Sequence, residues 1–288
     1  MAVVPALAPA KVNLFLHVGP VEADGYHPLA SLVAFADVGD RVSAGPSDRL
    51  SLTVTGSFAE GLAGEGDNLI LRAVRALAEA ADRPEPALAF TLDKQLPIAA
   101  GLGGGSSDAG AALRLARAAL GLSLDDAALA EVAAMVGADG PMCLHARAAW
   151  AGGRGDVLTF EPALPPLPAV LINPGVPSPT GAVYRAFDAG PAAAADRPAA
   201  PPSWTPRAVL DWLAAQRNDL QAPAIALVPA IGEALRQAAG LPAVRLVRMS
   251  GSGATVFALF ETPEDAQAAA RQLSSRHPDW WIRATIIA

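Results

Sequence analysis

The pattern of apolar and polar positions in the first half of the chain predicts interspersed strands and helices. Residues 11–18 alternate with a period of two, which is typical of a strand with two different faces. Strong helix formers, or apolar residues at helical spacing, predict helices at 69–77, 109–120 and 125–136. The other apolar runs of this half predict strands at 29–35, 41–44, 50–55, 88–92, 142–150 and 157–160.

The second half predicts a different arrangement. Apolar runs predict strands at 169–172, 244–249, 254–260 and 281–287, and helices at 180–186, 207–215, 229–239 and 263–276. The order strand–helix–strand–strand–helix–strand is ferredoxin-like, with extra helices inserted. Because residues 161–168 are rich in proline, we place a boundary there and expect domains at 1–163 and 164–288. Residues 191–206, rich in alanine and proline, are expected to be a mobile surface insertion.

A glycine-rich loop lies between the predicted strand at 88–92 and the helix that follows it. Its sequence is Pro97–Ile98–Ala99–Ala100–Gly101–Leu102–Gly103–Gly104–Gly105–Ser106–Ser107–Asp108. Glycines let backbone N–H groups converge, and the positive end of a helix dipole adds to their field, so the loop suits a phosphate. Ser106, Ser107 and Asp108 are residue types that cap the starts of helices, so we expect the helix to begin there. The alternative to a phosphate loop is a flexible tight turn before an ordinary capped helix.

Two better-known phosphate loops are excluded by what this stretch lacks. The P-loop pattern needs a lysine directly after its last glycine, and no lysine follows Lys94 anywhere in the chain. The dinucleotide pattern G-x-G-x-x-G fails as well, because its third glycine position, counted from Gly101, holds Ser106.

Lys11 and Asp139 are the candidates for charged chemistry. Lys11 shares a strand face with Asn13, and the alternative is a strand-end lysine that extends to water. Asp139 lies in the sequence Gly-Ala-Asp-Gly-Pro, where an aspartate is ordinarily a turn residue. The residues alone leave both alternatives open.

Three further positions carry polar or aromatic groups in turns. Tyr26 and His27 follow Asp24–Gly25, and the alternative for them is a tyrosine packed on the core beside a solvated histidine. Asn68, or Asp67 before it, is by default the N-cap of the helix at 69–77. Residues 250–253, Ser-Gly-Ser-Gly, either contact the glycine-rich loop or form a plain glycine turn.

Composition limits the classes of function. A net charge of −7 argues against broad nucleic-acid binding. A single cysteine, Cys143, permits no intrachain disulfide, and this fits a reducing compartment. The start of the chain does not resemble a signal peptide, and no apolar run approaches the ~20 residues of a membrane span. We therefore expect a cytoplasmic protein, with its oligomeric state left open.

The stretch Pro97-x-x-x-Gly101-Leu102-Gly103-Gly104-Gly105-Ser106-Ser107 resembles the ATP loop of the GHMP kinases, named for galactokinase, homoserine kinase, mevalonate kinase and phosphomevalonate kinase. Six further segments resemble the members that act on a cytidine diphosphate-linked polyol: 8–14, 24–27, 67–69, 137–139, 218–220 and 249–254. The similarity spans nearly the whole chain except 191–206. It implies a two-domain α+β fold, with a mixed α/β nucleotide-binding domain, a ferredoxin-like domain and the active site in the cleft between them.

The resemblance also implies roles for individual residues. Asp139 is expected to take the proton from the attacking hydroxyl, and Lys11 to hold the charge of Asp139 and of the transferring phosphoryl group. The loop from Pro97 to Ser107 is expected to wrap the phosphates of ATP, with Mg²⁺ bridging them and Asn68 directed towards the nucleotide. The protein ligands of the metal are left open, with Ser107 a candidate by its position alone.

The acceptor site implied by the resemblance uses aromatic and polar side chains. Tyr26, His27 and Tyr184 are expected to hold the cytidine by stacking and edge hydrogen bonds, with Asn13 and Thr180 nearby. The chain departs from the family pattern at Gly140, where a branched residue is common, and at 19–23, which lacks the arginine often found there.

Readings from other classes stay open at this point. A homoserine- or mevalonate-type kinase keeps the fold but does not need residues suited to stacking on a base. A dinucleotide oxidoreductase lacks the required glycine spacing. A non-catalytic nucleotide-binding protein has no need for both Lys11 and Asp139.

Overall fold

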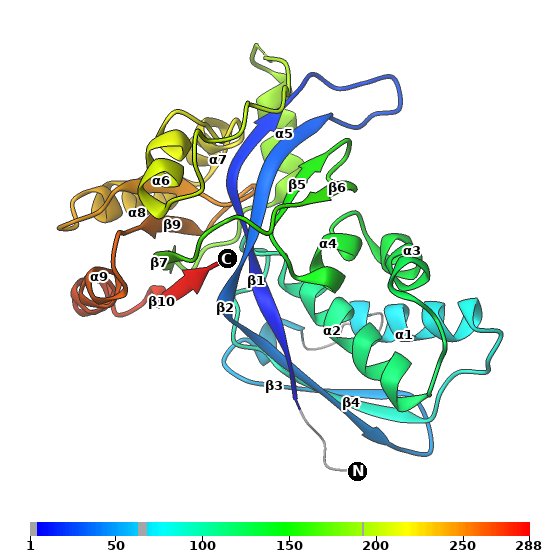
Figure 1. The fold of residues 1–288 in the computed structure, drawn as a ribbon. Coiled ribbons are helices and arrows are strands. Elements are labelled where there is room, and N and C mark those ends of the chain that lie inside the picture. Colours follow the sequence, from blue (N-terminus) through cyan, green and yellow to red (C-terminus); the bar gives the residue numbers. More distant parts are fainter. Residues whose placement is uncertain (1–4, 63–67, 192) are drawn as a thin grey trace. The chain divides into compact units, whose positions relative to one another are not determined.

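The computed structural model describes residues 5–62, 68–191 and 193–288, and the chain forms two compact units (Figure 1). Unit 1 comprises the described residues of 1–10, 39–98 and 103–146; unit 2 comprises 11–38, 99–102 and 147–288. The units interleave along the sequence because two long strands, β1 (Ala6–Val18) and β2 (Leu29–Pro46), contribute residues to both. This division differs from a single boundary at 163/164.

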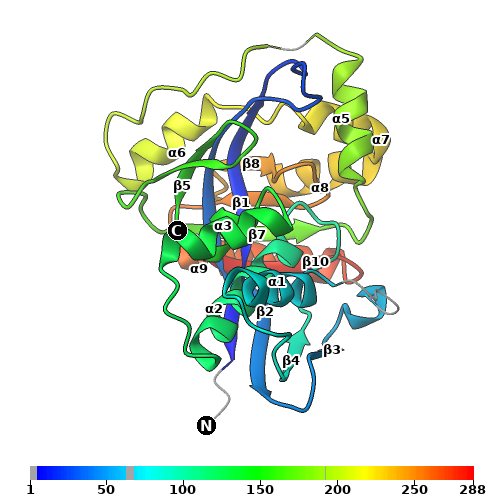
Figure 2. The ribbon, with the colours of Figure 1, turned by 90° about the vertical axis from the view of Figure 1, so that its right-hand side faces the viewer.

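Unit 1 is a small sheet covered by helices. The second part of β2 pairs antiparallel with β4 (Leu88–Asp93), which pairs parallel with β3 (Ser51–Thr55). The other elements are η1 (Ala59–Leu62), α1 (Leu69–Ala80), α2 (Gly104–Ala119), α3 (Asp126–Val136) and α4 (Gly140–His145). Apolar residues of α1, α2 and α3 form one core with those of the strands. The three helices contact one another (Figure 2). This core fixes α2, which begins within the glycine-rich loop.

Unit 2 contains the ferredoxin-like arrangement. Its strands are β5 (Ala149–Gly152), β6 (Val157–Phe160), β7 (Leu167–Asn173), β8 (Leu246–Met249), β9 (Val256–Leu259) and β10 (Trp281–Ile287). The last four follow the sheet order β10-β7-β9-β8 with antiparallel neighbours. The helices are α5 (Thr180–Asp188), α6 (Pro206–Ala214), α7 (Gln221–Leu227), α8 (Pro229–Ala239) and α9 (Pro263–Arg276), of which α8 and α9 pack on this sheet. The predicted α+β fold class is confirmed.

The structure corrects several predicted elements. The strand predicted at 142–150 is wrong over its first part, where Gly140–His145 forms α4 with Pro141 in its first turn. A short apolar run does not distinguish a buried helix from a strand, and here Met142, Cys143 and Leu144 are buried on a helix. The strands predicted at 29–35 and 41–44 are one continuous strand, β2.

The start of the central helix also differs from the prediction. Helix α2 begins at Gly104 after Gly103, which adopts a left-handed conformation and gives no side-chain cap. Ser106, Ser107 and Asp108 therefore lie inside the helix, and the capping role expected for them is wrong. Glycine is a poor helix former, so a helix that begins on Gly104 and Gly105 is not expected from its residue types.

Residues 193–201 form no helix or strand but are hydrogen-bonded to unit 2. Trp212 Nε1 donates to Ala199 O at 2.9 Å, and His17 Nδ1 lies 3.2 Å from Asp196 O. No helix in the described parts of the chain has the length and apolar character needed to cross a bilayer.

The contact between α3 and α4 predicts the effect of a side chain at position 140. A Cβ added to Gly140 would lie 2.0 Å from Ala133 O, a backbone atom. We therefore expect Gly140→Ala to destabilise the protein by about 1–3 kcal/mol in urea unfolding. Gly137→Ala is the matched control, because a Cβ there meets nothing within 4 Å. Equal stability of the two variants would contradict this packing.

Candidate functional site

The glycine-rich loop, residues 97–107, turns sharply before it enters α2. Ala99, Gly101 and Gly103 have positive φ angles of 51°, 74° and 61°. The first backbone hydrogen bond of α2 runs from Ser107 N to Gly103 O at 2.9 Å. The amides of 104–106 therefore precede the first helical hydrogen bond, and amides in this position bind anions. We call residues 97–107 the phosphate loop.

The loop is fixed in unit 2 by the serine–glycine turn, residues 250–253. Ser250 Oγ donates to Gly101 O at 2.9 Å, and Thr255 N donates to Ala100 O at 3.1 Å. A Cβ on Gly101 would lie 2.4 Å from Ser250 O. The prediction that this turn contacts the loop is confirmed, and the close approach explains the need for glycine at position 101.

The same turn contacts two residues predicted for the acceptor. Asn13 N donates to Ser250 Oγ at 3.2 Å, and Thr180 Oγ1 lies 2.8 Å from Ser252 Oγ. The Asn13 side chain is held by Ser31, because Nδ2 donates to its Oγ at 2.9 Å. The serine–glycine turn thus brings the loop, Asn13 and Thr180 together within unit 2.

Lys11 lies next to the loop along β1. Its backbone N–H donates to Leu102 O at 2.8 Å, and Lys11 as a whole is buried, with 7% of its surface exposed. The alternative of a strand-end lysine that extends to water is therefore wrong. Because the backbone of Lys11 is hydrogen-bonded to the loop, its side chain starts from a fixed position beside the loop residues of unit 2.

Asn68 and Asp139 belong to unit 1. Asn68 is the N-cap of α1, accepting a hydrogen bond from Ile70 N at 2.9 Å, so the default interpretation is confirmed. Asp67 lies outside the described residues. Asp139 precedes α4, with its carbonyl accepting from Cys143 N at 3.0 Å. A small cavity is lined by residues of both the Asp139 turn and the start of α2, among them Ser106, Gly137 and Gly140. These two segments are therefore neighbours in unit 1.

The aromatic residues predicted for the acceptor lie in unit 2. Their exposure is the reverse of the alternative, in which Tyr26 packs on the core and His27 is solvated. Tyr26 is 55% exposed, and the Arg154 guanidinium lies 4.1 Å from its ring centroid. His27 is the packed residue. Its ring lies 5.0 Å from that of Tyr184, with Nδ1 2.9 Å from Gly19 O and Nε2 3.3 Å from Asp188. His27 and Tyr184 thus form one aromatic surface.

A buried charge cluster lies at the base of the loop in unit 1. Lys94 Nζ donates to Asp40 Oδ2 at 2.6 Å and to Asp108 Oδ2 at 2.7 Å, and all three side chains are almost fully buried. We call these residues the Lys94 triad. Burial raises the pKa of Asp108 to about 7. The Lys94 ammonium acts to lower this pKa, whereas the Asp40 carboxylate acts to raise it. Burial opposes the charge of Lys94, but the two carboxylates outweigh it and raise its pKa.

The oxygen groups near the loop bear on the expected Mg²⁺. Ser107 Oγ is buried and has no hydrogen-bond partner among the described residues. No group of three or more histidine, cysteine, aspartate or glutamate residues within 5–62, 68–191 and 193–288 is arranged to hold a metal ion. Magnesium needs few protein ligands when phosphates supply the others.

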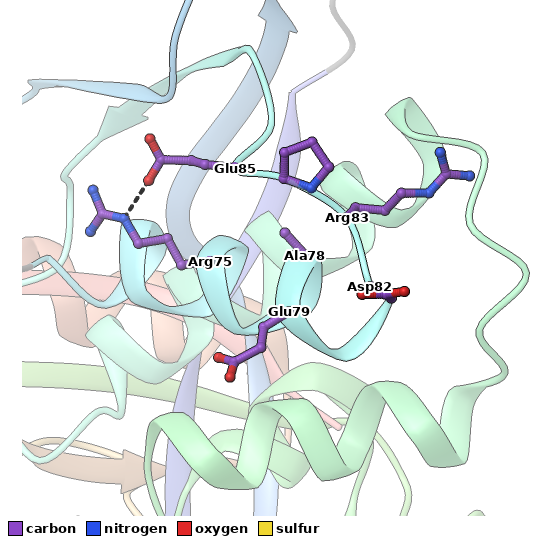
Figure 3. A pocket seen from close by; sticks show the side chains of 7 residues that line it. Arg75, Ala78, Glu79, Asp82, Arg83 and Glu85 are labelled. Carbon is purple, nitrogen blue, oxygen red and sulfur yellow. Dashed lines mark hydrogen bonds and ion pairs between the residues drawn. The ribbon is translucent and has the colours of Figure 1, made fainter.

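An open pocket at the end of α1 is separate from these residues. It is lined by Arg75, Ala78, Glu79, Asp82, Arg83, Pro84 and Glu85 (Figure 3). Arg75 Nε and Glu85 Oε2 form an exposed ion pair at 2.7 Å there. The lining mixes both charge signs and includes no residue predicted for the site.

Sequence reasoning missed several residues that the structure places around the loop. Asn218 Nδ2 donates to Met249 O and to Gly251 O, both at 2.8 Å, and so supports the serine–glycine turn. The segment 218–220 belongs to the family resemblance, but its local sequence does not indicate which residues the Asn218 side chain contacts. Lys94 and Asp108 were missed because their pairing joins residues distant in sequence, although the rarity of lysine in the chain was a usable signal.

Comparison with known proteins agrees with this arrangement. Residues 68–147 match the protein family described as "GHMP kinases N terminal domain", and residues 207–279 match the one described as "GHMP kinases C terminal". A 4-diphosphocytidyl-2-C-methyl-D-erythritol kinase of Caulobacter vibrioides is 53% identical over 281 residues, covering 96% of this chain and 97% of the relative. One of Dinoroseobacter shibae is 49% identical, covering 99% and 95%.

Solved structures give the same result. A crystal structure of 4-(cytidine 5'-diphospho)-2C-methyl-D-erythritol kinase matches with a TM-score of 0.80 and 36% identity, covering 99% of both chains. A homoserine kinase from Cytophaga hutchinsonii matches with a TM-score of 0.69 and 18% identity, covering 99% of this chain and 95% of the other, which shows the shared fold alone. From its full-length similarity to these relatives, the chain belongs to the 4-diphosphocytidyl-2-C-methyl-D-erythritol kinase family of the GHMP kinases.

Proposed function

We infer that this chain is a phosphotransferase that uses ATP to phosphorylate the 2-hydroxyl of 4-diphosphocytidyl-2-C-methyl-D-erythritol, a step of the non-mevalonate route to isoprenoid precursors. The observation that carries this is about 50% identity to kinases of that name over nearly the whole chain. A homoserine kinase and a mevalonate kinase, which represent the alternative, match in structure at 18% and 12% identity, and such a likeness shows the fold alone. A cytoplasmic location fits the single cysteine.

The phosphate loop is proposed to hold the ATP phosphates. Phosphoryl transfer depends mainly on positioning and on neutralising charge, with little covalent chemistry supplied by the protein. Backbone amides at the start of α2 are fixed donors that need no reorganisation as charge develops. Mg²⁺ is proposed to enter with ATP as part of the substrate, where it would neutralise charge on the phosphates. Ser107 Oγ, buried and without a described partner, is the side-chain oxygen proposed to meet the phosphates or their metal.

Asp139 and Lys11 are proposed as the catalytic residues. A carboxylate near the acceptor can take the proton of the 2-hydroxyl as the oxygen bonds to phosphorus. The hydroxyl oxygen then carries the phosphoryl group, and ADP leaves. An ammonium beside the loop stabilises the charge that develops on the transferring group. The position of Lys11, bonded through its backbone to Leu102, supports this role.

The acceptor is proposed to bind in unit 2 through its cytidine. Tyr184 and His27 provide an aromatic surface on which a base can stack, and Tyr26 is exposed on the same loop as His27. Asn13 and Thr180 contact the serine–glycine turn, so they supply polar groups close to the loop residues. Asn68 is proposed to face the nucleotide from the start of α1, although its side-chain oxygen is engaged as a cap.

The direct test of the function is product analysis. Incubation with ATP, Mg²⁺ and the diphosphocytidyl alcohol is expected to give one added phosphate by mass spectrometry, attached at the 2-hydroxyl by phosphorus-coupled nuclear magnetic resonance. Homoserine and mevalonate serve as controls. Faster phosphorylation of either control would reject the proposed acceptor.

Removing the proposed base or cation should lower turnover. Asp139→Asn and Lys11→Ala are each expected to reduce kcat by about 100-fold or more, because each removes a charge needed in the transition state. The measurement is kcat at saturating ATP and acceptor. Unchanged thermal unfolding shows that the variants are folded. Near-native kcat in both folded variants would contradict the assignment.

The close approach of the loop to the serine–glycine turn predicts a third effect. Gly101→Ala is expected to raise KM for ATP about tenfold or more, because its Cβ would meet Ser250 O and the φ of 74° disfavours a side chain. Gly190→Ala is the control, since its Cβ makes an ordinary contact at 3.5 Å. An unchanged KM in Gly101→Ala would show that the loop position does not govern ATP binding.

A further inference from the structure

The Lys94 triad lies at both ends of the phosphate loop. Lys94 precedes the loop by three positions, and Asp108 follows its last residue directly. The bond from the Lys94 ammonium to Asp108 therefore joins two residues that are 14 positions apart and closes the segment between them. Asp40 extends this closure, because its Oδ1 accepts from Gln95 N at 2.6 Å and Leu96 N at 2.8 Å.

We propose that Lys94, Asp40 and Asp108 are positioning residues for the phosphate loop, which fix its two ends in the conformation that binds the nucleotide phosphates. The proposal rests on the proposed role of the loop in ATP binding. None of the three residues is assigned to contact ATP. They act through the backbone of residues 95–96 and through the first turn of α2.

The geometry around the ammonium leaves little freedom. A Cβ on Gly104, the first residue of α2, would lie 3.0 Å from Lys94 Nζ and 3.6 Å from Asp40 Oδ2. The loop backbone therefore passes directly over the triad without a side chain between them. A movement of the Lys94 ammonium towards Gly104 would crowd the backbone of this residue, whose amide belongs to the group proposed to bind phosphate.

General energetics explain why stability alone is a poor reason for such a cluster. Burying three charged side chains carries a large desolvation cost, and apolar replacements of similar volume are often neutral or stabilising. A flexible loop, by contrast, loses conformational entropy each time it binds a ligand. Fixing the loop ends in advance removes part of that cost. The triad is therefore expected to contribute more to nucleotide binding than to the free energy of unfolding.

The test separates these two contributions. Asp108→Leu removes the bond to the ammonium and leaves Lys94 and Asp40 as a neutral pair, so the protein is expected to fold. Asp108→Asn keeps an oxygen acceptor for Lys94 and should have a smaller effect. Asp40→Asn loosens the other end of the loop and gives an independent variant. Glu85→Gln is the control, because it removes the exposed ion pair with Arg75 in the same unit.

The measurements are the Kd of ADP with Mg²⁺ by calorimetry, KM for ATP, the Kd of the acceptor, and Tm. Asp108→Leu and Asp40→Asn are expected to raise the Kd of ADP and KM for ATP about tenfold or more, with acceptor Kd within about twofold. Asp108→Asn should lie between wild type and Asp108→Leu. A lower Tm with unchanged nucleotide affinity would overturn the proposal and leave the triad a purely structural feature.

The outcome stays decisive even if the loop is not the nucleotide site. In that case ADP either does not bind to wild type or binds with an affinity that Gly101→Ala leaves unchanged, and the proposed function of the loop would fail. Hydrogen exchange of the amides of 103–107 then tests the triad without a ligand. At least tenfold faster exchange in Asp108→Leu would support positioning of the loop, and unchanged exchange would overturn it.

Discussion

The close contact between Gly101 and the serine–glycine turn is the constraint on which the proposed site depends. The carbonyl of Gly101 accepts from Ser250 Oγ, and no side chain fits between the two backbones. One residue later, Leu102 O accepts from Lys11 N. Because these contacts hold residues 101 and 102, the backbone amides that follow them start from a fixed position. Glycine at position 101 is therefore required both by conformation and by space.

Charge is distributed in a similar way at the base of the loop. The chain has only two lysines, and both lie beside the phosphate loop: Lys11 through its backbone contact and Lys94 through its ion pairs. Their surroundings differ. Lys94 is enclosed by two carboxylates and is neutralised by them, so it suits a role in structure. Lys11 is proposed to act on the reacting groups, as a second cation held on a strand.

Much of the fold was predictable because the periodic segments are long and consistent. The amphipathic helix α1 and the ferredoxin-like order follow from patterns within each segment. Helix α4 was not predictable, because the short apolar run Met142–Cys143–Leu144 fits a buried strand equally well. The capping roles expected at Ser106–Asp108 were wrong because the helix begins earlier, at Gly104, after Gly103 in a left-handed conformation.

The site was predictable only in part. The phosphate loop was identified by its glycines, and the roles of Asp139 and Lys11 came from family resemblance and stay predictions. Local sequence gave no information on which of Tyr26 and His27 packs, because that depends on Tyr184 in a distant helix. The bond from Asn13 to Ser250 joins residues 237 positions apart, beyond any local pattern.

The most direct measurement is a crystal structure of the protein with Mg²⁺, a non-hydrolysable ATP analogue and the diphosphocytidyl alcohol. The account predicts that the amides of 101–107 contact the β- and γ-phosphates, with the Asp139 carboxylate within hydrogen-bonding distance of the 2-hydroxyl. Phosphates bound away from this loop, or an acceptor hydroxyl out of reach of Asp139, would contradict it.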